Sequence, residues 1–327
     1  MFKNLSTSRL GIAGVQSEII ELAVSFGFKA IELDLPEFEL RTEAKGFDYA
    51  IRLIKSAEMN LGYFVLPVAW QDSEERYQED LAKLAGQAEI AARVGCPRAV
   101  TLLSPYSDER PYHENFEFHR KRLGEIADVL GQHGVRLGLG FQALPALRKD
   151  RAFEFVHTFD ELVKLAGSIS EGNVGIVLDV WQRYVAGSSD AELEALTADQ
   201  IVSVNLADAP ADVPLDELTD EQRLLPGASG VVDSGAVARR LVEIEYPGPV
   251  TAKPHASAFQ KAGRVDIVRA LGQALEDVWV AAGLSEPRAA PLAAPPSDES
   301  EPAEDSADEE DDAETVAAGE DGQASSD

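Results

Sequence analysis

Short apolar runs alternate with longer amphipathic segments along most of the chain. The apolar runs predict eight β-strands, at Arg9–Ala13, Ala30–Leu33, Leu61–Leu66, Ala99–Leu103, Val135–Phe141, Val174–Leu178, Ile201–Leu206 and Val250–Ala252. Between them apolar residues recur at helical spacing, and one such stripe runs from Leu81 to Ala91 and stops at Gly95. Strands that alternate with helices predict a parallel α/β fold, and eight is the number of strands that closes a (β/α)₈ barrel.

We therefore predict a single (β/α)₈ TIM barrel over residues 1–285. An open doubly wound sheet is the alternative that strand counting leaves open. No GxGxxG motif opens a helix after the first predicted strand, which weakens the dinucleotide-binding form of that alternative.

The alternating pattern stops after Ala281. Residues 286–327 are rich in Pro, Ala, Asp and Glu and contain one basic residue, Arg288. Side chains larger than alanine are almost all polar there, so the segment cannot bury enough apolar surface to offset its chain entropy. We predict a disordered acidic tail. Two roles stay open for it, contact with a basic partner and maintenance of solubility.

Acidic residues outnumber basic ones both in the tail and in the body. The 58 Asp and Glu residues against 29 Lys and Arg residues give a net charge of −29. Such a chain does not attract phosphate backbones, so we expect no nucleic-acid partner. No apolar run is long enough for a membrane span or a signal-peptide core. The single cysteine, Cys96, excludes a disulfide framework, and together these features predict a cytoplasmic protein.

Period-two alternation in the last four strands places polar residues at one point. Side chains alternate between the two faces of a strand, and the chemistry of such barrels lies at the C-terminal strand ends. Apolar residues are assigned to the helix layer: Leu137, Leu139, Phe141, Ile176, Leu178, Val202, Val204, Leu206, Val250 and Ala252. The residues on the opposite face then converge on one pocket at Gly140, Asp179, Asn205 and Lys253.

Several longer blocks resemble a known family in order and spacing. They are PYHENFEFHRKRLGEIADVLGQHGVRLGLGF, FVHTFDEL, VGIVLDVWQRY, VSVNLADAPADVPLDE, RLLPGASGVVD and YPGPVTAKP. Over nearly all of residues 8–283 the chain resembles the sugar phosphate isomerase/epimerase family, the xylose-isomerase-like TIM barrels. The resemblance implies a sugar or polyol ligand and a divalent metal such as Mn, Mg, Co or Zn. Its ligands would be a Glu, an Asp, a His and a Glu at the ends of strands five to eight.

At the four positions that the resemblance assigns to the metal, this chain has Gly140, Asp179, Asn205 and Lys253. A substrate-facing His that the family places three residues after the Asp is Gln182 here. An ammonium about 4 Å from a divalent ion would repel it by roughly 8 kcal/mol at an effective dielectric of 20. We therefore predict no metal and no cofactor, and expect Lys253 to pair with Asp179.

Four more residues are candidates for ligand binding. Asp208 and Arg223 match the family, and Arg223 would either contact an anionic ligand group or pair with a loop acid such as Asp216. Asp208 would alternatively orient the loop after the seventh strand. Trp181 would stack on a sugar ring or pack under the following loop. His255 lies two residues beyond the last strand, at the rim of the pocket.

Two further acids, Glu32 and Asp34, lie at the end of the second strand, and by position alone we expect them to line the mouth. The remaining histidines fall away from the strand ends and are interpreted as structural or solvated: His113, His119, His133 and His157.

Three hypotheses for function follow. The preferred one is a catalytically degenerate family member that binds a small sugar, polyol or sugar phosphate without a metal. The alternative enzyme is a metal-free isomerase, epimerase or lyase that uses Lys253 as base or amine with Asp179 as its partner. The third is an interaction scaffold that uses the acidic tail. A homo-oligomer is left open by the sequence.

Overall fold

The computed structural model describes residues 1–169 and 172–286. Residues Met1–Pro287 form one compact unit. The segment predicted to be a disordered tail lies outside the described residues from position 287 onward. Within the described ranges, none of the helices combines the length and apolarity that crossing a membrane requires.

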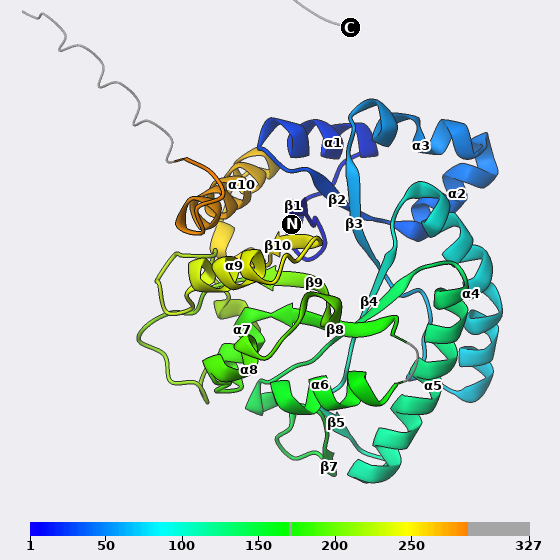
Figure 1. Cartoon of the computed structure of the whole chain (residues 1–327), viewed down its shortest axis with the longest axis vertical. Helices are drawn as coiled ribbons and strands as arrows, with labels where there is room; N and C mark the ends of the chain where they lie inside the picture. Colours follow the sequence, from blue (N-terminus) through cyan, green and yellow to red (C-terminus); the bar gives the residue numbers. More distant parts are fainter. Residues whose placement is uncertain (170–171, 287–327) are drawn as a thin grey trace, which may run out of the picture. The chain divides into compact units, whose positions relative to one another are not determined.

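Eight parallel strands close into a barrel, which confirms the predicted TIM barrel fold (Figure 1). Around the barrel the strands follow the order β1-β10-β9-β8-β6-β4-β3-β2. They are β1 (Phe2–Leu5), β2 (Ala30–Leu33), β3 (Asn60–Val65), β4 (Arg98–Leu102), β6 (Arg136–Gly140), β8 (Val174–Asp179), β9 (Ile201–Leu206) and β10 (Pro249–Ala252).

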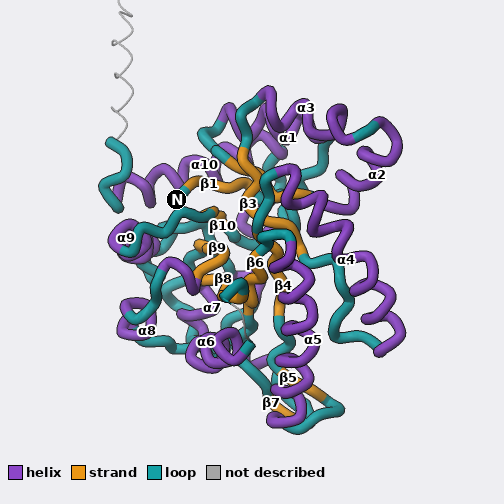
Figure 2. Tube along the Cα trace, turned by 45° about the vertical axis from the view of Figure 1, so that its right-hand side comes forward, coloured by secondary structure: helices purple, strands orange, loops and turns teal. Residues whose placement is uncertain are grey.

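Helices surround the barrel, as Figure 2 shows. They are α1 (Gln16–Ser25), α2 (Leu35–Lys45), α3 (Phe47–Ser56), α4 (Glu74–Val94), α5 (Tyr112–Gln132), α6 (Phe159–Ser168), α7 (Val180–Val185), α8 (Asp190–Glu194), α9 (Ser234–Glu243) and α10 (Arg264–Ala281). Single 3₁₀ turns are η1 (Pro145–Leu147), η2 (Ala198–Gln200), η3 (Asp220–Gln222) and η4 (Ala256–Phe259). A short antiparallel pair, β5 (Tyr106–Ser107) with β7 (Phe153–Glu154), forms a separate two-stranded sheet.

Side-chain caps fix where several helices begin. Asp34 accepts a hydrogen bond from the backbone N–H of Glu37 at 3.0 Å and caps α2, so this residue, placed at the mouth by position, has a structural role. Thr158 and Glu161 form a reciprocal capping box at the start of α6. Each cap satisfies N–H groups that the first helical turn leaves without a partner, and stabilises the helix by about 1 kcal/mol.

The first strand is the one predicted strand that is wrong. It was expected at Arg9–Ala13 but forms at Phe2–Leu5, whereas the other seven agree with the prediction to within one residue. Arg9 and Gly11 both have φ of 67°, which turns the backbone back on itself at this point. The sequence pattern did not indicate a strand at Phe2–Leu5 because a charged residue, Lys3, lies within it. The aliphatic stem of Lys3 is buried, and its ammonium pairs with Glu276 in the outer layer of the barrel.

Val202 departs from the predicted alternation, which assigned it to the helix layer, and Phe141, assigned to the same layer, is among the residues that line the cavity. The β8–β9 register shifts between Ile176 and Val177, so that consecutive pairs skip Val202. A Cβ atom at Gly138 would come within 3.0 Å of the Cβ of Val202, which places this valine inside the barrel. A side chain at position 138 in β6 would therefore crowd Val202, which would have to shift by a few tenths of an ångström.

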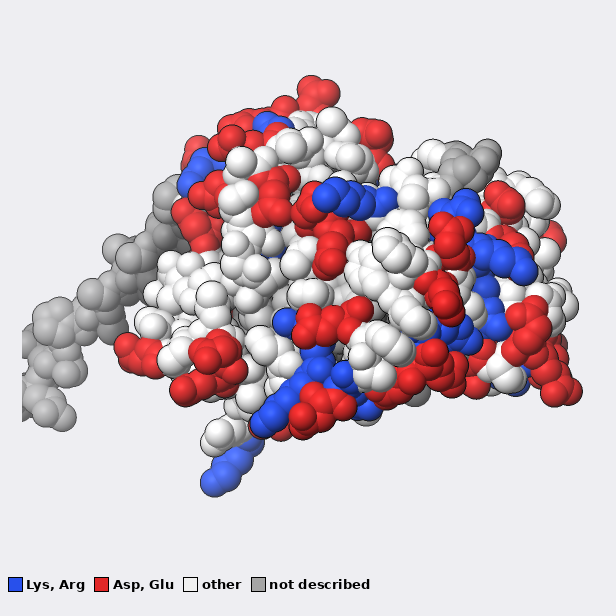
Figure 3. All heavy atoms as spheres, turned by 90° about the horizontal axis from the view of Figure 1, so that it is seen from below, with Lys and Arg blue, Asp and Glu red and all other residues white. Residues whose placement is uncertain are grey.

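The molecular surface mixes both signs of charge. In the face shown in Figure 3, acidic side chains extend across the visible surface with basic ones among them. This pattern agrees with the acidic composition of the chain.

Candidate functional site

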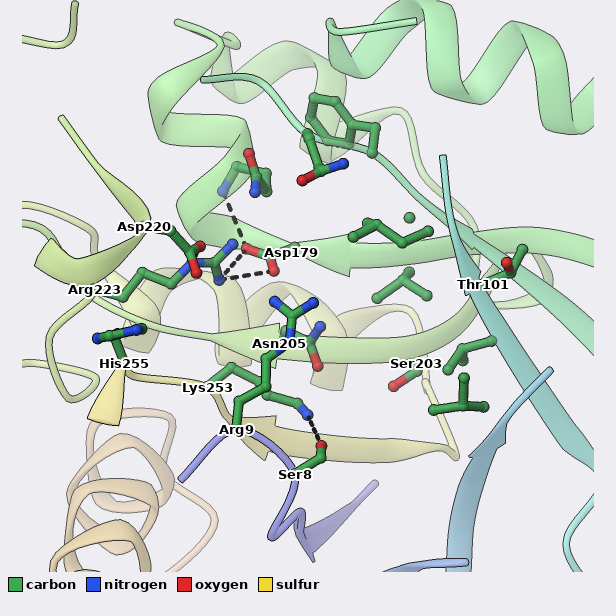
Figure 4. Close-up of a pocket in the computed structure, with 18 of the residues that line it drawn as sticks. Ser8, Arg9, Thr101, Asp179, Ser203, Asn205, Asp220, Arg223, Lys253 and His255 are labelled. Carbon is green, nitrogen blue, oxygen red and sulfur yellow. Dashed lines mark hydrogen bonds and ion pairs between the residues drawn. The ribbon is translucent and has the colours of Figure 1, made fainter. Parts of the chain in front are cut away.

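A cavity of about 340 Å³ opens at the C-terminal ends of the barrel strands (Figure 4). As the alternation predicts, Gly140, Asp179, Asn205 and Lys253 all line it. Gln182, Arg223 and His255 line it as well, whereas Trp181 and Asp208 do not. Its size suits a small molecule.

One wall of the cavity is apolar. Val65 at the end of β3 and Leu102 at the end of β4 are 58% and 42% exposed, although both are large hydrophobic side chains. Leu144 and Leu147, beside η1, continue this wall. Solvated apolar surface inside a cavity is a feature of ligand sites, where it covers the nonpolar face of the bound molecule.

The opposite wall carries a buried ion pair between Asp179 and Arg223. The Arg223 Nη1 atom donates to both carboxylate oxygens of Asp179, at 3.0 and 3.3 Å. Its Nε atom donates to Asp220 at 2.8 Å, so the loop acid that pairs with Arg223 is Asp220 and not Asp216. Burial opposes the charge of Arg223, but the two carboxylates outweigh it and raise the pKa of its guanidinium. Arg223 is thus held as a fixed cation in the cavity wall.

Lys253 does not pair with Asp179, contrary to the prediction. Its Nζ donates to the Ser6 Oγ at 2.6 Å and to the Ser8 Oγ at 3.3 Å, and lies 3.9 Å from a carboxylate oxygen of Glu32. Both serine hydroxyls also donate to Glu32. Lys253 directly follows β10, which pairs with β1, so the Lys253 side chain meets the residues that follow β1. Because the first strand was predicted at Arg9–Ala13, Ser6 and Ser8 were not expected at the barrel mouth.

Burial and charge act in opposite directions on Lys253. Burial lowers the pKa of its ammonium, but Tyr63 and Glu32 outweigh that effect, and the pKa lies above its ordinary value. The Tyr63 ring centroid is 5.8 Å from the ammonium nitrogen. Lys253 therefore stays protonated at neutral pH.

The cavity floor offers polar atoms without a partner. The Ser203 Oγ and the Asn205 Oδ1 are buried and have no hydrogen-bond partner within the described part of the chain. Both residues line the cavity. Gln182, by contrast, is engaged, since its Oε1 accepts from the backbone N–H of Ala143 at 2.7 Å. Unpaired buried polar atoms at a cavity wall are groups that a ligand can satisfy.

Trp181 lies outside the cavity, whereas His255 lines its rim. Trp181 is fully buried, and the Arg223 guanidinium lies 4.4 Å from its ring centroid, so the ring supports the arginine and does not face the cavity. Trp181 is the second residue of α7, and its side chain is buried in the protein core. His255 lies at the rim as predicted, with its Nδ1 bonded to Ser257, and its backbone N–H donates to the carbonyl of Arg223 at 3.0 Å.

Asp208 holds the loop after β9, the alternative that the sequence left open for it. Its buried carboxylate accepts four backbone N–H groups at 2.8–2.9 Å, from Ala209, Ser229, Gly230 and Val232. Burial disfavours the charge, but these hydrogen bonds outweigh it and lower the pKa of the carboxyl. Asp208 also forms an antiparallel bridge with Leu224, the residue after Arg223. It is therefore a positioning residue for Arg223.

Sequence reasoning missed Arg9 because it assigned this residue to a strand. The structure places it in the turn after β1, where it lines the cavity. Figure 4 shows its side chain pointing into the pocket. Ser6 and Ser8 were not predicted as site residues either, because the first strand was expected to begin only at Arg9.

The donor set at this mouth does not fit a divalent metal. The four positions provide no side chain at Gly140, a carboxylate already bound to Arg223, the neutral amide of Asn205 and the ammonium of Lys253. Across residues 1–169 and 172–286, no group of three His, Cys, Asp or Glu side chains is arranged to hold a metal ion. Divalent ions need several carboxylate, imidazole or thiolate ligands.

Comparisons with known proteins agree with this fold. The profile of the xylose isomerase-like TIM barrel family matches residues 20–276. An inosose isomerase of Bacillus subtilis (strain 168) is 26% identical over 205 residues, which cover 63% of this chain and 70% of that protein.

Two solved structures share the architecture. A xylose isomerase domain protein from Alicyclobacillus acidocaldarius subsp. acidocaldarius superposes with a TM-score of 0.78 at 24% identity, over 86% of this chain and 99% of that one. The IOLI protein with a bound zinc atom superposes with a TM-score of 0.72 at 20% identity, over 86% and 98% of the two chains. Since the family profile spans most of the barrel, the chain belongs to the xylose isomerase-like TIM barrel family.

Proposed function

We propose that the barrel mouth binds a small sugar, polyol or sugar phosphate without a divalent metal, and that the chain does not catalyse metal-dependent isomerisation. The observation that carries the proposal is the ion pair of Asp179 with Arg223, which engages the one carboxylate left among the expected metal ligands. The name of the inosose isomerase relative supports a polyhydroxylated ligand. Zinc, which the IOLI protein binds, generally takes three or four His, Cys, Asp or Glu ligands, and no three such side chains are grouped to hold a metal ion among the described residues.

Electrostatics supports the exclusion of metal from this mouth. A divalent ion about 4 Å from the Lys253 ammonium would be repelled by roughly 8 kcal/mol at an effective dielectric of 20. An ion bound to Asp179 would also lie beside the Arg223 guanidinium that pairs with this carboxylate, and this second fixed positive charge adds to the repulsion. Both costs oppose binding before any ligand bond forms.

The two walls of the cavity suit a polyhydroxylated molecule. The apolar wall at Val65 and Leu102 matches the C–H face of a sugar ring. The unpartnered Ser203 Oγ and Asn205 Oδ1 on the floor can bond ligand hydroxyl groups. This combination favours a ring or chain with one apolar face and several hydroxyls.

The alternative enzyme, acting through Lys253 and Asp179, receives no support from the contacts. The raised pKa of Lys253 keeps its amine protonated, so that it serves poorly as a nucleophile or a base at neutral pH. Asp179 pairs with Arg223 and caps α7 through the N–H of Gln182. Neither residue is placed to assist the other.

A metal titration tests the proposal. The purified full chain is subjected to elemental analysis and to thermal unfolding with and without Mn²⁺, Mg²⁺, Co²⁺ or Zn²⁺. We expect no stoichiometric metal and no shift in Tm. A metal bound only to the folded state at 100 times its Kd would raise Tm by roughly 5–10 °C, and near-stoichiometric metal with such a shift would overturn the proposal.

A gain-of-metal variant provides the positive control. Gly140→Glu, Asn205→His and Lys253→Glu together supply the carboxylates and imidazole that the resemblance predicts. The Cβ of residue 140 would lie 3.2 Å from the Cδ1 of Leu102, an exposed side chain that can rotate away. We expect this triple variant to bind metal, which would show that the assay detects a site at this mouth.

A further inference from the structure

We infer that the side of the mouth formed by β1 and β10 is an anion subsite, in which Arg9 and Lys253 hold a carboxylate or phosphate group of the ligand. The inference rests on the proposed function and narrows its ligand to an anionic sugar. It follows from the distribution of charge in the cavity, the backbone of Arg9 and the unpartnered atoms on the floor.

The cations of the cavity differ in how far they are already neutralised. Arg223 is matched by Asp179 and Asp220. Lys253 has one carboxylate, Glu32, at 3.9 Å. Arg9 makes no hydrogen bond or ion pair with any residue in the described ranges. The β1–β10 side therefore holds two cations for one carboxylate, and an anionic group would complete its charge.

This arrangement corrects the role first considered for Arg223. Its planar fork was a candidate clamp for phosphate or carboxylate, but Nε and Nη1 are bonded to Asp220 and Asp179. The guanidinium of Arg9, which also lines the cavity, donates none of its N–H groups to another of the described residues. The proposed anion subsite therefore lies at the β1 side of the mouth, near Arg9, and not at the β9 side, near Arg223.

The backbone around Arg9 supports a role in ligand binding. Arg9 adopts φ of 67°, a left-handed conformation that side chains other than Gly and Asn adopt at a cost. The next residue, Leu10, is buried and anchors the turn on the core. Strained backbone that positions a charged side chain at a cavity is characteristic of binding sites. Figure 4 shows Arg9 and Lys253 reaching into the same pocket.

The neighbouring floor completes the site for a sugar. Ser203 is 1% exposed, its Oγ has no partner within the described residues, and it lines the same cavity. Asn205 carries the second unpartnered atom, Oδ1. A ligand with its anionic group between Arg9 and Lys253 places its hydroxyls toward these atoms and its apolar face toward Leu102.

Isothermal titration calorimetry on the full chain tests the subsite with three matched probes: D-glucose, D-glucuronate and D-glucose 6-phosphate. We expect the wild-type chain to bind one or both anionic probes more tightly than D-glucose, and the two separate a carboxylate site from a phosphate site. Arg9→Gly should weaken anionic binding by about ten- to a hundredfold, the usual weight of a charge-assisted hydrogen bond.

A second variant controls for charge and backbone. Lys261 is an exposed cation with φ of 64° that does not line the cavity. Lys261→Gly removes the same charge from the same backbone conformation and should leave binding unchanged. Glycine adopts a left-handed conformation without strain, so Arg9→Gly should not lower the Tm, and a loss of binding then reports the missing guanidinium.

The outcomes separate the two proposals. If D-glucose binds as tightly as both anionic probes, or if Arg9→Gly binds like the wild type, the anion subsite is wrong while sugar binding stands. If none of the three probes binds the wild-type chain, both proposals are wrong.

Discussion

Replacing Asp179 by Asn removes one charge of the buried pair while preserving shape. Both side chains are nearly buried, with 11% exposed for Asp179 and 10% for Arg223. Loss of one partner leaves a buried charge uncompensated and costs about 3–5 kcal/mol. Asn still accepts the hydrogen bond from Gln182 that starts α7. Asp220 retains part of the pairing of Arg223, so we expect the lower end, about 3 kcal/mol of unfolding free energy.

Equilibrium urea unfolding of the full chain measures the effect. Asp179→Asn, Arg223→Met and the double variant form a cycle that isolates the interaction between the two side chains. We expect a coupling energy of about 2–3 kcal/mol, and a Tm lowered by roughly 6 °C in the Asp179→Asn variant. A coupling energy within about 0.5 kcal/mol of zero would refute the conclusion that this pair holds the wall of the cavity.

Three further predictions concern other residues of the barrel unit. Burial lowers the pKa of His119 to about 4, so the unfolded chain binds a proton that the folded chain does not, and stability should fall by about 3 kcal/mol as the pH drops from 6.5 to 4. His119→Phe should remove that slope in urea titrations at several pH values. Asp208→Ala removes the acceptor of four backbone N–H groups, of which those of Ala209 and Val232 are buried, and should destabilise by about 2–4 kcal/mol in the same assay, with Ser257→Ala as a surface control. Gly138→Ala should cost about 1–3 kcal/mol through contact with Val202, and Val202→Ala in the same chain should recover part of it; no recovery would contradict an inward Val202.

The sequence alone was sufficient for the barrel and for the convergence at its mouth. Seven strands and the meeting of Gly140, Asp179, Asn205 and Lys253 follow from period-two alternation, because the C-terminal ends of parallel strands share one edge.

Contacts among the converging residues could not be predicted in the same way. Alternation gives the face of a strand on which a side chain lies but not the direction in which a long side chain leans. Lys253 leans toward Ser6, and Arg223 reaches Asp179 from a loop whose course depends on Asp208. Arg9 was missed because an apolar run of RLGIA looks like a strand until the positive φ angles are known.

Hydrogen bonds of its own hold the loop that carries Arg223. Asp208 accepts four N–H groups from it, and Asp208 and Leu224 exchange backbone hydrogen bonds at 2.9 and 3.1 Å. We expect a loop held in this way not to close over the ligand as a lid and not to limit the rate of association. We expect stopped-flow binding traces with one exponential phase, whose rate rises linearly with ligand concentration.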